Sequence, residues 1–171
     1  MYEQYWKMQR PAFRALQPGD GFFPAHSHQS ALLKFRFLID HEQPAAALIG
    51  EPGVGKTFVL DRFLSDLAPA NSPVIRLLFP LLTPSELVSY LARRLGGSEP
   101  FPAAPDLWLD HWEAQLARLQ QEGRRPIVII DDAQAIDDPL VWQTLHLLLN
   151  YRHGDRPAFT LVLCGQPELA G

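Results

Sequence analysis

Residues Gly50 to Thr57 read Gly-Glu-Pro-Gly-Val-Gly-Lys-Thr, and this phosphate-binding pattern constrains the fold more than any other part of the chain. Its three glycines allow a tight turn whose backbone N–H groups converge on an anion. Lys56 would reach the β- and γ-phosphates, Thr57 would offer its hydroxyl to Mg²⁺, and the positive end of the following helix would face the same phosphates. The pattern therefore predicts a nucleoside triphosphate site between a strand and a helix.

The residues on both sides of the loop agree with this prediction. Ala45 to Ile49 form a short apolar run typical of a buried strand, and apolar residues recur at helical spacing after the loop. A chance match in a Gly-rich turn would lack these flanks. We expect nucleotide contacts from the loop and its first helical turn, and from one histidine that precedes the loop and would approach the base: Gly50, Glu51, Pro52, Gly53, Val54, Gly55, Lys56, Thr57, Phe58 and His28.

Two acidic residues follow the most continuous apolar run of the chain, Pro126 to Ile130. A carboxylate at the carboxyl end of a buried parallel strand points into the phosphate region of such a site. Asp131 would hold Mg²⁺ in partnership with Thr57, and Asp132 would orient the attacking water as a catalytic residue beside Lys56. The alternative is that both acids only solvate the strand end or cap the next turn.

Gln166 follows the last predicted strand, where its amide would reach the γ-phosphate or the attacking water. The alternative is an ordinary polar residue in a strand-to-helix turn. Cys164, two residues earlier, has no base next to it in the sequence, so a buried thiol is favoured over a nucleophile. Gln166 is thus the third predicted catalytic residue.

Strands and helices alternate along the whole chain, which predicts an α/β fold. Strands are expected at 45–49, 74–79, 126–130 and 159–164, and helices from Ser27 or Ser30 to about Asp40, after the phosphate loop, from the capping box at Thr83 to Gly96, at 106–122 and from Asp138 to about Arg152. The pattern fits a parallel sheet with helices on both faces and the ligand at the carboxyl ends of the strands. Residues 1–24, rich in aromatic residues and prolines, would form an arm packed on a core over residues 25–171.

Composition narrows the possible partners and surroundings. The 171 residues carry a net charge of −4, so a broad basic surface for nucleic acid is not supported, although a local patch for DNA remains open. A single cysteine fits a reducing compartment, and we expect a cytoplasmic location. No run approaches the roughly 18 apolar residues of a spanning helix, and the start of the chain is too polar for a secretory signal. The six histidines lack ligand spacing for a metal.

Several further stretches accompany the phosphate loop: Met1–Trp6 with Pro11–Phe13, Phe22 and Phe23, His28, Ala31 and Leu32, Ile129–Gln134 and Cys164–Leu169. Together they resemble the ExeA-like secretion-pathway AAA+ ATPases, of which transposition-helper ATPases are near relatives. The resemblance implies a P-loop AAA+ core of three layers, with Lys56 and Thr57 on phosphate and Mg²⁺, Asp131 on Mg²⁺, and Gln166 as the first sensor. It also implies ATP as the nucleotide, a homo-oligomer in the full-length protein, and a secretion or transposition partner.

Two departures from the family lower the hydrolysis we expect. The family usually has glutamate where this chain has Asp132. The shorter aspartate side chain withdraws the carboxylate by about 1 Å, which positions a water less well. The sequence stops at Gly171, before the arginine finger, the fifth strand and the helical lid of the family. We therefore expect a fragment or truncated relative of a motor subunit, with an exposed sheet edge and poor hydrolysis alone.

Three functions from different classes follow from these observations. The first is an ATP-driven switch, in which contacts of Lys56 and Gln166 with the γ-phosphate bias assembly with partners. The second is a nucleotide-dependent module that recruits DNA or a transposase with little turnover. The third is a small-molecule kinase, which is disfavoured by the Asp131–Gln134 pattern and by the absence of a recognisable acceptor lid.

Overall fold

A computed structural model of the chain describes residues 2–7, 25–67, 72–96 and 101–170. Its centre is a four-stranded parallel sheet in the order β1-β6-β3-β2, made of β1 (Ala45–Ile49), β2 (Val74–Leu77), β3 (Ile127–Ile130) and β6 (Thr160–Gly165). All three neighbouring pairs run parallel, so the carboxyl ends of the four strands meet at one edge. The predicted parallel sheet is confirmed.

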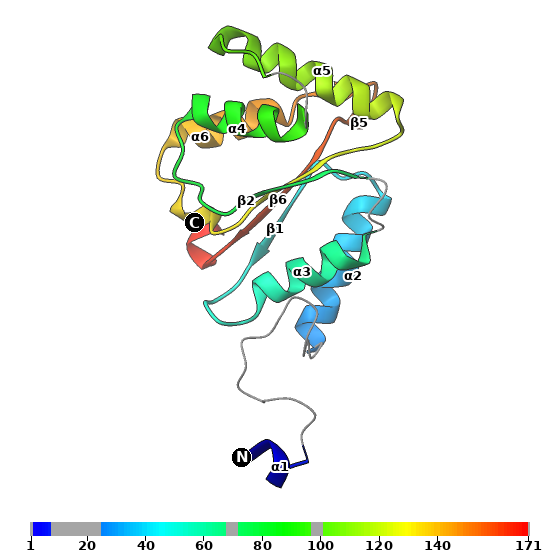
Figure 1. The fold of residues 1–171 in the computed structure, drawn as a ribbon, viewed down its shortest axis with the longest axis vertical. Helices are drawn as coiled ribbons and strands as arrows, with labels where there is room; N and C mark the ends of the chain where they lie inside the picture. Colours follow the sequence, from blue (N-terminus) through cyan, green and yellow to red (C-terminus); the bar gives the residue numbers. More distant parts are fainter. Residues whose placement is uncertain (1, 8–24, 68–71, 97–100, 171) are drawn as a thin grey trace.

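Helices cover both faces of this sheet (Figure 1). One face carries α2 (His26–Asp40) and α3 (Lys56–Asp66), and the other carries α4 (Pro84–Gly96), α5 (Trp108–Gln121) and α6 (Pro139–Leu148). Short elements complete the described part of the chain: α1 (Tyr2–Tyr5), η1 (Pro105–Leu107), η2 (Ala133–Ala135), η3 (Pro167–Ala170) and the pair β4 (Arg152–His153) and β5 (Arg156–Pro157). The result is the predicted three-layer arrangement.

Strand β3 shows how the sequence produces these layers. All four of its residues are buried, as the continuous apolar run requires. Because side chains alternate along a strand, Ile127 and Ile129 pack into the cluster with α2 and α3, while Val128 and Ile130 pack into the cluster with α4, α5 and α6. Burial of an isoleucine of this kind contributes about 2 kcal/mol. By the same alternation, Asp131, two residues after Ile129, belongs to the face of the sheet that carries α3.

The predicted capping box begins α4. The backbone N–H and the hydroxyl of Thr83 both donate to Glu86 Oε2 over 2.8 Å, and the Glu86 N–H donates back to Thr83 Oγ1 over 3.4 Å. These bonds satisfy donors that a helix start leaves without partners. Asp138 caps α6 in a similar way, because its Oδ1 accepts from the N–H of Leu140 over 2.9 Å.

Several expected boundaries differ in the structure. Neither Ser27 nor Ser30 caps α2; its N-cap is Ala25, in an extended conformation with no side-chain cap. The second strand ends at Leu77 rather than residue 79. Strands β3 and β6 each start one residue later than predicted.

The helix predicted to reach Arg152 was too long, because α6 ends at Leu148. Arg152 instead pairs with Pro157 in the antiparallel β4–β5 ladder, which turns through Gly154 at φ +63°. A positive φ of this kind suits glycine, so Gly154 fits the turn between the two strands. Within the arm predicted over residues 1–24, Met1 and residues 8–24 lie outside the described part, so the packing of the arm stays a prediction.

No helix in the described ranges is both long and apolar enough to cross a membrane. The four parallel strands end at one edge of the sheet, and the loops that follow them start there.

Candidate nucleotide-binding site

The phosphate loop connects the end of β1 directly to the start of α3. Gly53 has φ +80° and Gly55 has φ +89°, conformations that side chains adopt at a cost, so these two positions require glycine. Gly55 is also the N-cap of α3 and has no side-chain cap, so the first N–H groups of the helix stay open to an anion. The loop thus has the backbone of a phosphate nest.

Lys56 is the first residue of α3, and its side chain folds back over the loop. Its Nζ donates to the carbonyl oxygen of Gly50 over 2.7 Å and to that of Glu51 over 3.0 Å. The ammonium group therefore lies across the mouth of the loop, held by two neutral acceptors. Phosphate oxygens would be stronger acceptors for it, because both partners would then be charged.

His28 reaches the loop from α2, while its expected approach to the base stays a prediction. Its Nε2 lies 2.8 Å from the carbonyl oxygen of Val54, and a Cβ built on Gly55 would lie 3.4 Å from the same nitrogen. Beside this contact is a cleft of about 600 Å³ between α2, the edge of β1 and the loop. His28, Val54 and Lys56 all line it, together with mostly apolar atoms. A volume of this size is typical of small-molecule sites.

The other predicted residues reach the same edge from β3 and β6. Asp131 and Asp132 follow β3, and Gln166 follows β6. The N–H of Gly50 donates to the carbonyl of Gly165 over 3.2 Å, which joins the loop directly to the segment of Gln166. Asp132 is exposed and has φ +50°, an unusual conformation for a residue other than glycine and one that tends to occur at functional sites.

Gln134, in η2, joins two of these segments and was not assigned a role from the sequence. Its Nε2 donates to Asp132 Oδ1 over 3.1 Å, and its Oε1 accepts the backbone N–H of Gln166 over 3.1 Å. Gly165 makes room for it, because a Cβ at that position would lie 2.8 Å from Gln134 Oε1. The family resemblance marked Gln134 as distinctive, which was the signal that could have led to this role.

Arg76 on β2 is a second residue that sequence reasoning missed. Its guanidinium group donates to Asp131 Oδ2 and to Asp61 Oδ1, each over 2.7 Å. Burial alone would lower the pKa of Arg76, but the hydrogen bonds and charges of Asp131 and Asp61 outweigh it, and the pKa is raised. Asp131 therefore lies beside a permanent positive charge.

Cys164, on β6, also lies against Asp131. Burial raises the pKa of the Cys164 thiol to about 12, and the charge and hydrogen bond of Asp131 contribute in the same direction. A thiol in this state is neither nucleophilic nor a metal ligand at neutral pH. The finding agrees with the sequence-based interpretation of a buried thiol.

The donor set at this edge suits Mg²⁺ rather than a softer metal. Thr57, at the second position of α3, is exposed, and Asp131 adds a carboxylate at the strand end. Hydroxyl and carboxylate oxygens, completed by water and phosphate, are the ligands that Mg²⁺ prefers. Phe58, the next residue of α3, is half-buried. Across the described residues no three His, Cys, Asp or Glu side chains come together as a metal site.

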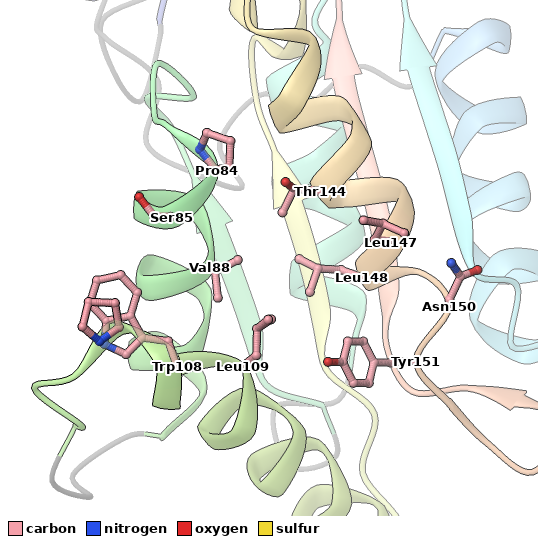
Figure 2. A pocket seen from close by; sticks show the side chains of 11 residues that line it. Pro84, Ser85, Val88, Trp108, Leu109, Thr144, Leu147, Leu148, Asn150 and Tyr151 are labelled. Carbon is pink, nitrogen blue, oxygen red and sulfur yellow. The ribbon is translucent and has the colours of Figure 1, made fainter.

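A second cavity, of about 650 Å³, lies between α4, α5 and α6, on the other face of the sheet from α2 and α3 (Figure 2). Figure 2 shows Val88 of α4, Leu109 of α5 and Leu147 and Leu148 of α6 around it. Its lining is mostly apolar and includes none of the residues predicted for the nucleotide site. The sheet separates it from α3 and the phosphate loop.

Comparisons with known proteins agree with this arrangement. The sequence is 30% identical to General secretion pathway protein A of Aeromonas hydrophila over 173 aligned residues, which cover 99% of this chain. The chain spans about 30% of the length of that relative.

Two solved structures share the fold. The ORC2 protein of Aeropyrum pernix, solved in ADPNP and ADP complexes, matches with a TM-score of 0.64 and 16% identity over 90% of this chain and 44% of its own. Cdc6p of Pyrobaculum aerophilum matches with a TM-score of 0.59 and 16% identity over 94% of this chain and 42% of its own. At this identity the likeness establishes the fold alone. The sequence profile described as an AAA domain matches residues 39–171, so the chain belongs to the AAA domain family.

Proposed function

We propose that this chain binds Mg-ATP at the carboxyl edge of its sheet and hydrolyses it as an AAA+ ATPase core. The observation that carries the proposal is the meeting of three separate segments at that edge. The phosphate loop, the acidic pair after β3 and Gln166 after β6 are joined by the Gly50–Gly165 bond and by Gln134. A chance loop match would not bring an acidic pair and a polar amide to the same place.

Each residue has a separate task in this proposal. Lys56 would exchange its two carbonyl acceptors for β- and γ-phosphate oxygens, while the loop N–H groups hold the same phosphates. Mg²⁺, when bound beside Thr57 and Asp131, supplies charge neutralisation for the phosphates. Asp132 would accept the proton of the attacking water, and Gln166 would orient that water or contact the γ-phosphate.

The cleft beside the loop would take the base and sugar of the nucleotide. Its wall of α2 and β1 is largely apolar, and His28 at its inner end already contacts the loop. A flat base packs well against such a surface, while the triphosphate extends to the loop. Adenine is proposed from the family, whose relatives include a structure solved with ADPNP and ADP.

Coupling to partners is part of the proposal. Contacts of Lys56 and Gln166 with the γ-phosphate would differ before and after hydrolysis. This difference would bias the assembly or remodelling of partner proteins. The relative in Aeromonas hydrophila is named for general secretion, and this chain spans about 30% of it. A homo-oligomer and a secretion partner are therefore proposed for the longer protein.

A second candidate is a nucleotide-dependent recruiting module with little turnover, acting on DNA or a transposase. One observation favours it. Asp132 has a shorter side chain than glutamate, and in this structure its carboxylate is held by Gln134. In this candidate, the hydrogen bond donated by Gln134 lowers the basicity of the Asp132 carboxylate, so that Asp132 would accept a proton from water poorly.

One titration tests both candidates. A fluorescent ATP analogue is titrated in Mg²⁺ against the wild type, Lys56→Ala and Lys7→Ala, and phosphate release is followed in matched samples with ATP. Lys7→Ala is the control. Lys7 is exposed and lies outside the proposed site, and its substitution removes the same charge as Lys56→Ala. We expect Lys56→Ala to weaken binding by about tenfold or more, and Lys7→Ala to leave it unchanged.

The outcomes separate the candidates. Binding that depends on Lys56, with slow but measurable phosphate release, supports the ATPase. Binding without release above background, combined with ATP-dependent and salt-sensitive DNA binding, supports the recruiting module. Equal binding by the wild type and Lys56→Ala contradicts both.

A further inference from the structure

Arg76 lies on β2 at the register position of Ile129 on β3, and its side chain reaches across to the face of α3. There it links two acidic residues that are far apart in the sequence. Nη1 donates to Asp61 Oδ1 of α3 and Nη2 donates to Asp131 Oδ2, both over 2.7 Å. The side chains of Arg76 and Asp131 are only 24% and 12% exposed, so water screens this contact weakly.

Both oxygens of the Asp131 carboxylate accept a hydrogen bond in this arrangement. Oδ2 accepts from Arg76, and Oδ1 accepts the backbone N–H of Asp132 over 3.2 Å. The side chain proposed to hold Mg²⁺ is therefore fixed in direction and already faces one positive charge. Arginine keeps that charge at every accessible pH, so the bridge cannot be released by losing a proton.

This geometry has a consequence for metal binding. A divalent cation that approaches Asp131 without nucleotide meets the guanidinium charge and gains little from a carboxylate that is already neutralised. The phosphates of a bound nucleotide bring several negative charges and reverse that balance. Metal and nucleotide would then bind together rather than one after the other.

We propose that Arg76 is a positioning residue that makes Mg²⁺ binding at Asp131 depend on nucleotide. The proposal rests on the proposed function, because it concerns the same site. A merely structural ion pair between β2 and α3 predicts something different. Its loss would loosen the site and weaken both metal and nucleotide binding.

Substitutions of Arg76 and of Asp61 should shift metal binding in opposite directions. Arg76→Gln removes the positive charge and frees Asp131, while Asp61→Asn removes the competing anion and leaves Arg76 to Asp131 alone. Arg76→Lys keeps the charge. All three changes alter the same bridge, but with different effects on its charge, so the variants act as controls for one another.

Two measurements are made on each variant. Mn²⁺, a paramagnetic probe for Mg²⁺, is titrated without nucleotide and its free fraction is read by electron paramagnetic resonance. The Mg²⁺ concentration at half-maximal binding of a fluorescent ATP analogue is then measured. Thermal melts report whether each variant is folded.

For Arg76→Gln we expect tighter Mn²⁺ binding without nucleotide and a Mg²⁺ midpoint lowered on the order of tenfold. Asp61→Asn is expected to raise the midpoint, and Arg76→Lys to stay near the wild type. Folded Arg76→Gln with an unchanged or raised midpoint overturns the proposal. If Arg76→Gln does not fold, Asp61→Asn decides, and an unchanged or lowered midpoint overturns it.

Failure of the proposed function is visible separately. In that case the wild type binds no ATP analogue at any Mg²⁺ concentration. The Mn²⁺ titration without nucleotide still tests Arg76, because tighter Mn²⁺ binding by Arg76→Gln than by the wild type supports the role and equal binding overturns it.

Discussion

Gln134 donates from Nε2 to Asp132 Oδ1 over 3.1 Å, and this bond joins a residue of η2 to the second acid of the site. The other end of the same amide accepts the backbone N–H of Gln166 over 3.1 Å. One side chain therefore connects the loop after β3 with the loop after β6. The direction of the Asp132 carboxylate and the position of the Gln166 segment are set together.

Gln134→Glu is expected to lower phosphate release about tenfold while the affinity for nucleotide changes less than about twofold. The substitution keeps an oxygen for the Gln166 N–H but places a second negative oxygen against Asp132. Single-turnover phosphate release with excess protein, beside titration of an ATP analogue, measures the two effects. Release that equals the wild type would argue against an orienting role for Gln134.

Gly165→Ala tests the same contact from the other side. The new Cβ would lie 2.8 Å from Gln134 Oε1 and 2.9 Å from Leu169 Cδ2, so the Gln134 side chain must move. We expect slower phosphate release here too, with the phosphate loop still able to bind. Gly123→Ala cannot serve as a matched control for this variant. Gly123 has φ +68°, so an alanine at that position would add backbone strain.

Asp132→Glu is expected to raise phosphate release, and Asp132→Asn to lower it by on the order of 10² or more. The longer side chain brings a carboxylate about 1 Å further toward a water, and the amide cannot accept its proton. Both variants should bind the ATP analogue as the wild type does. If Asp132→Asn hydrolyses ATP at the wild-type rate, Asp132 is not the base.

Thr83→Ala removes the cap of α4 and is expected to lower the free energy of unfolding by about 1 kcal/mol at neutral pH. Hydrogen bonds from the backbone and side chain of Thr83 lower the pKa of Glu86 below its ordinary value of 4.5. A lowered pKa contributes stability above the unfolded value that is lost as pH falls through the folded one. Urea unfolding at pH 7 and pH 3 should thus show the Thr83→Ala difference shrinking in acid.

Cys164 should make stability fall in alkali. Because its pKa is raised to about 12 in the folded state, the folded chain keeps the proton that the unfolded chain loses. Its contribution is full below the unfolded thiol pKa and disappears as pH rises through the folded value. From about pH 8.5 upward the free energy of unfolding should drop more steeply for the wild type than for Cys164→Ala. Parallel curves would show that the thiol does not titrate this way.

The parts of the fold that depend on neighbours in the sequence were predictable. The apolar run at 45–49, the glycines of the loop and the helix after it are adjacent, so one motif predicted all three elements. The expectation that the strand is buried was wrong, because β1 lies at the sheet edge and its residues alternate between exposed and half-buried. The capping box at Thr83 is equally local. Strand β3 was predictable because burial on both faces demands a continuous apolar run.

Contacts through space were not predictable from one sequence. Arg76 and Asp131 are separated by 55 residues, and Gln134 and Gln166 by 32, so no local pattern pairs them. The β4–β5 ladder was missed because two residues per strand carry no periodicity. The sequence thus predicted roles for Asp131, Asp132 and Gln166, whereas the contacts of Gln134 and Arg76 with these segments are visible only in the fold.

Strand β1 lies at one edge of the four-stranded sheet, and among the described residues its strand partner is β6. Gly50 follows its last residue without a spacer, so the loop that would carry the phosphates is suspended from the rim of the sheet rather than from its middle. A segment that paired along Ala45–Ile49 would pull on that loop through one covalent bond. A strand added along this edge would therefore act on the phosphate loop through the backbone that β1 and the loop share.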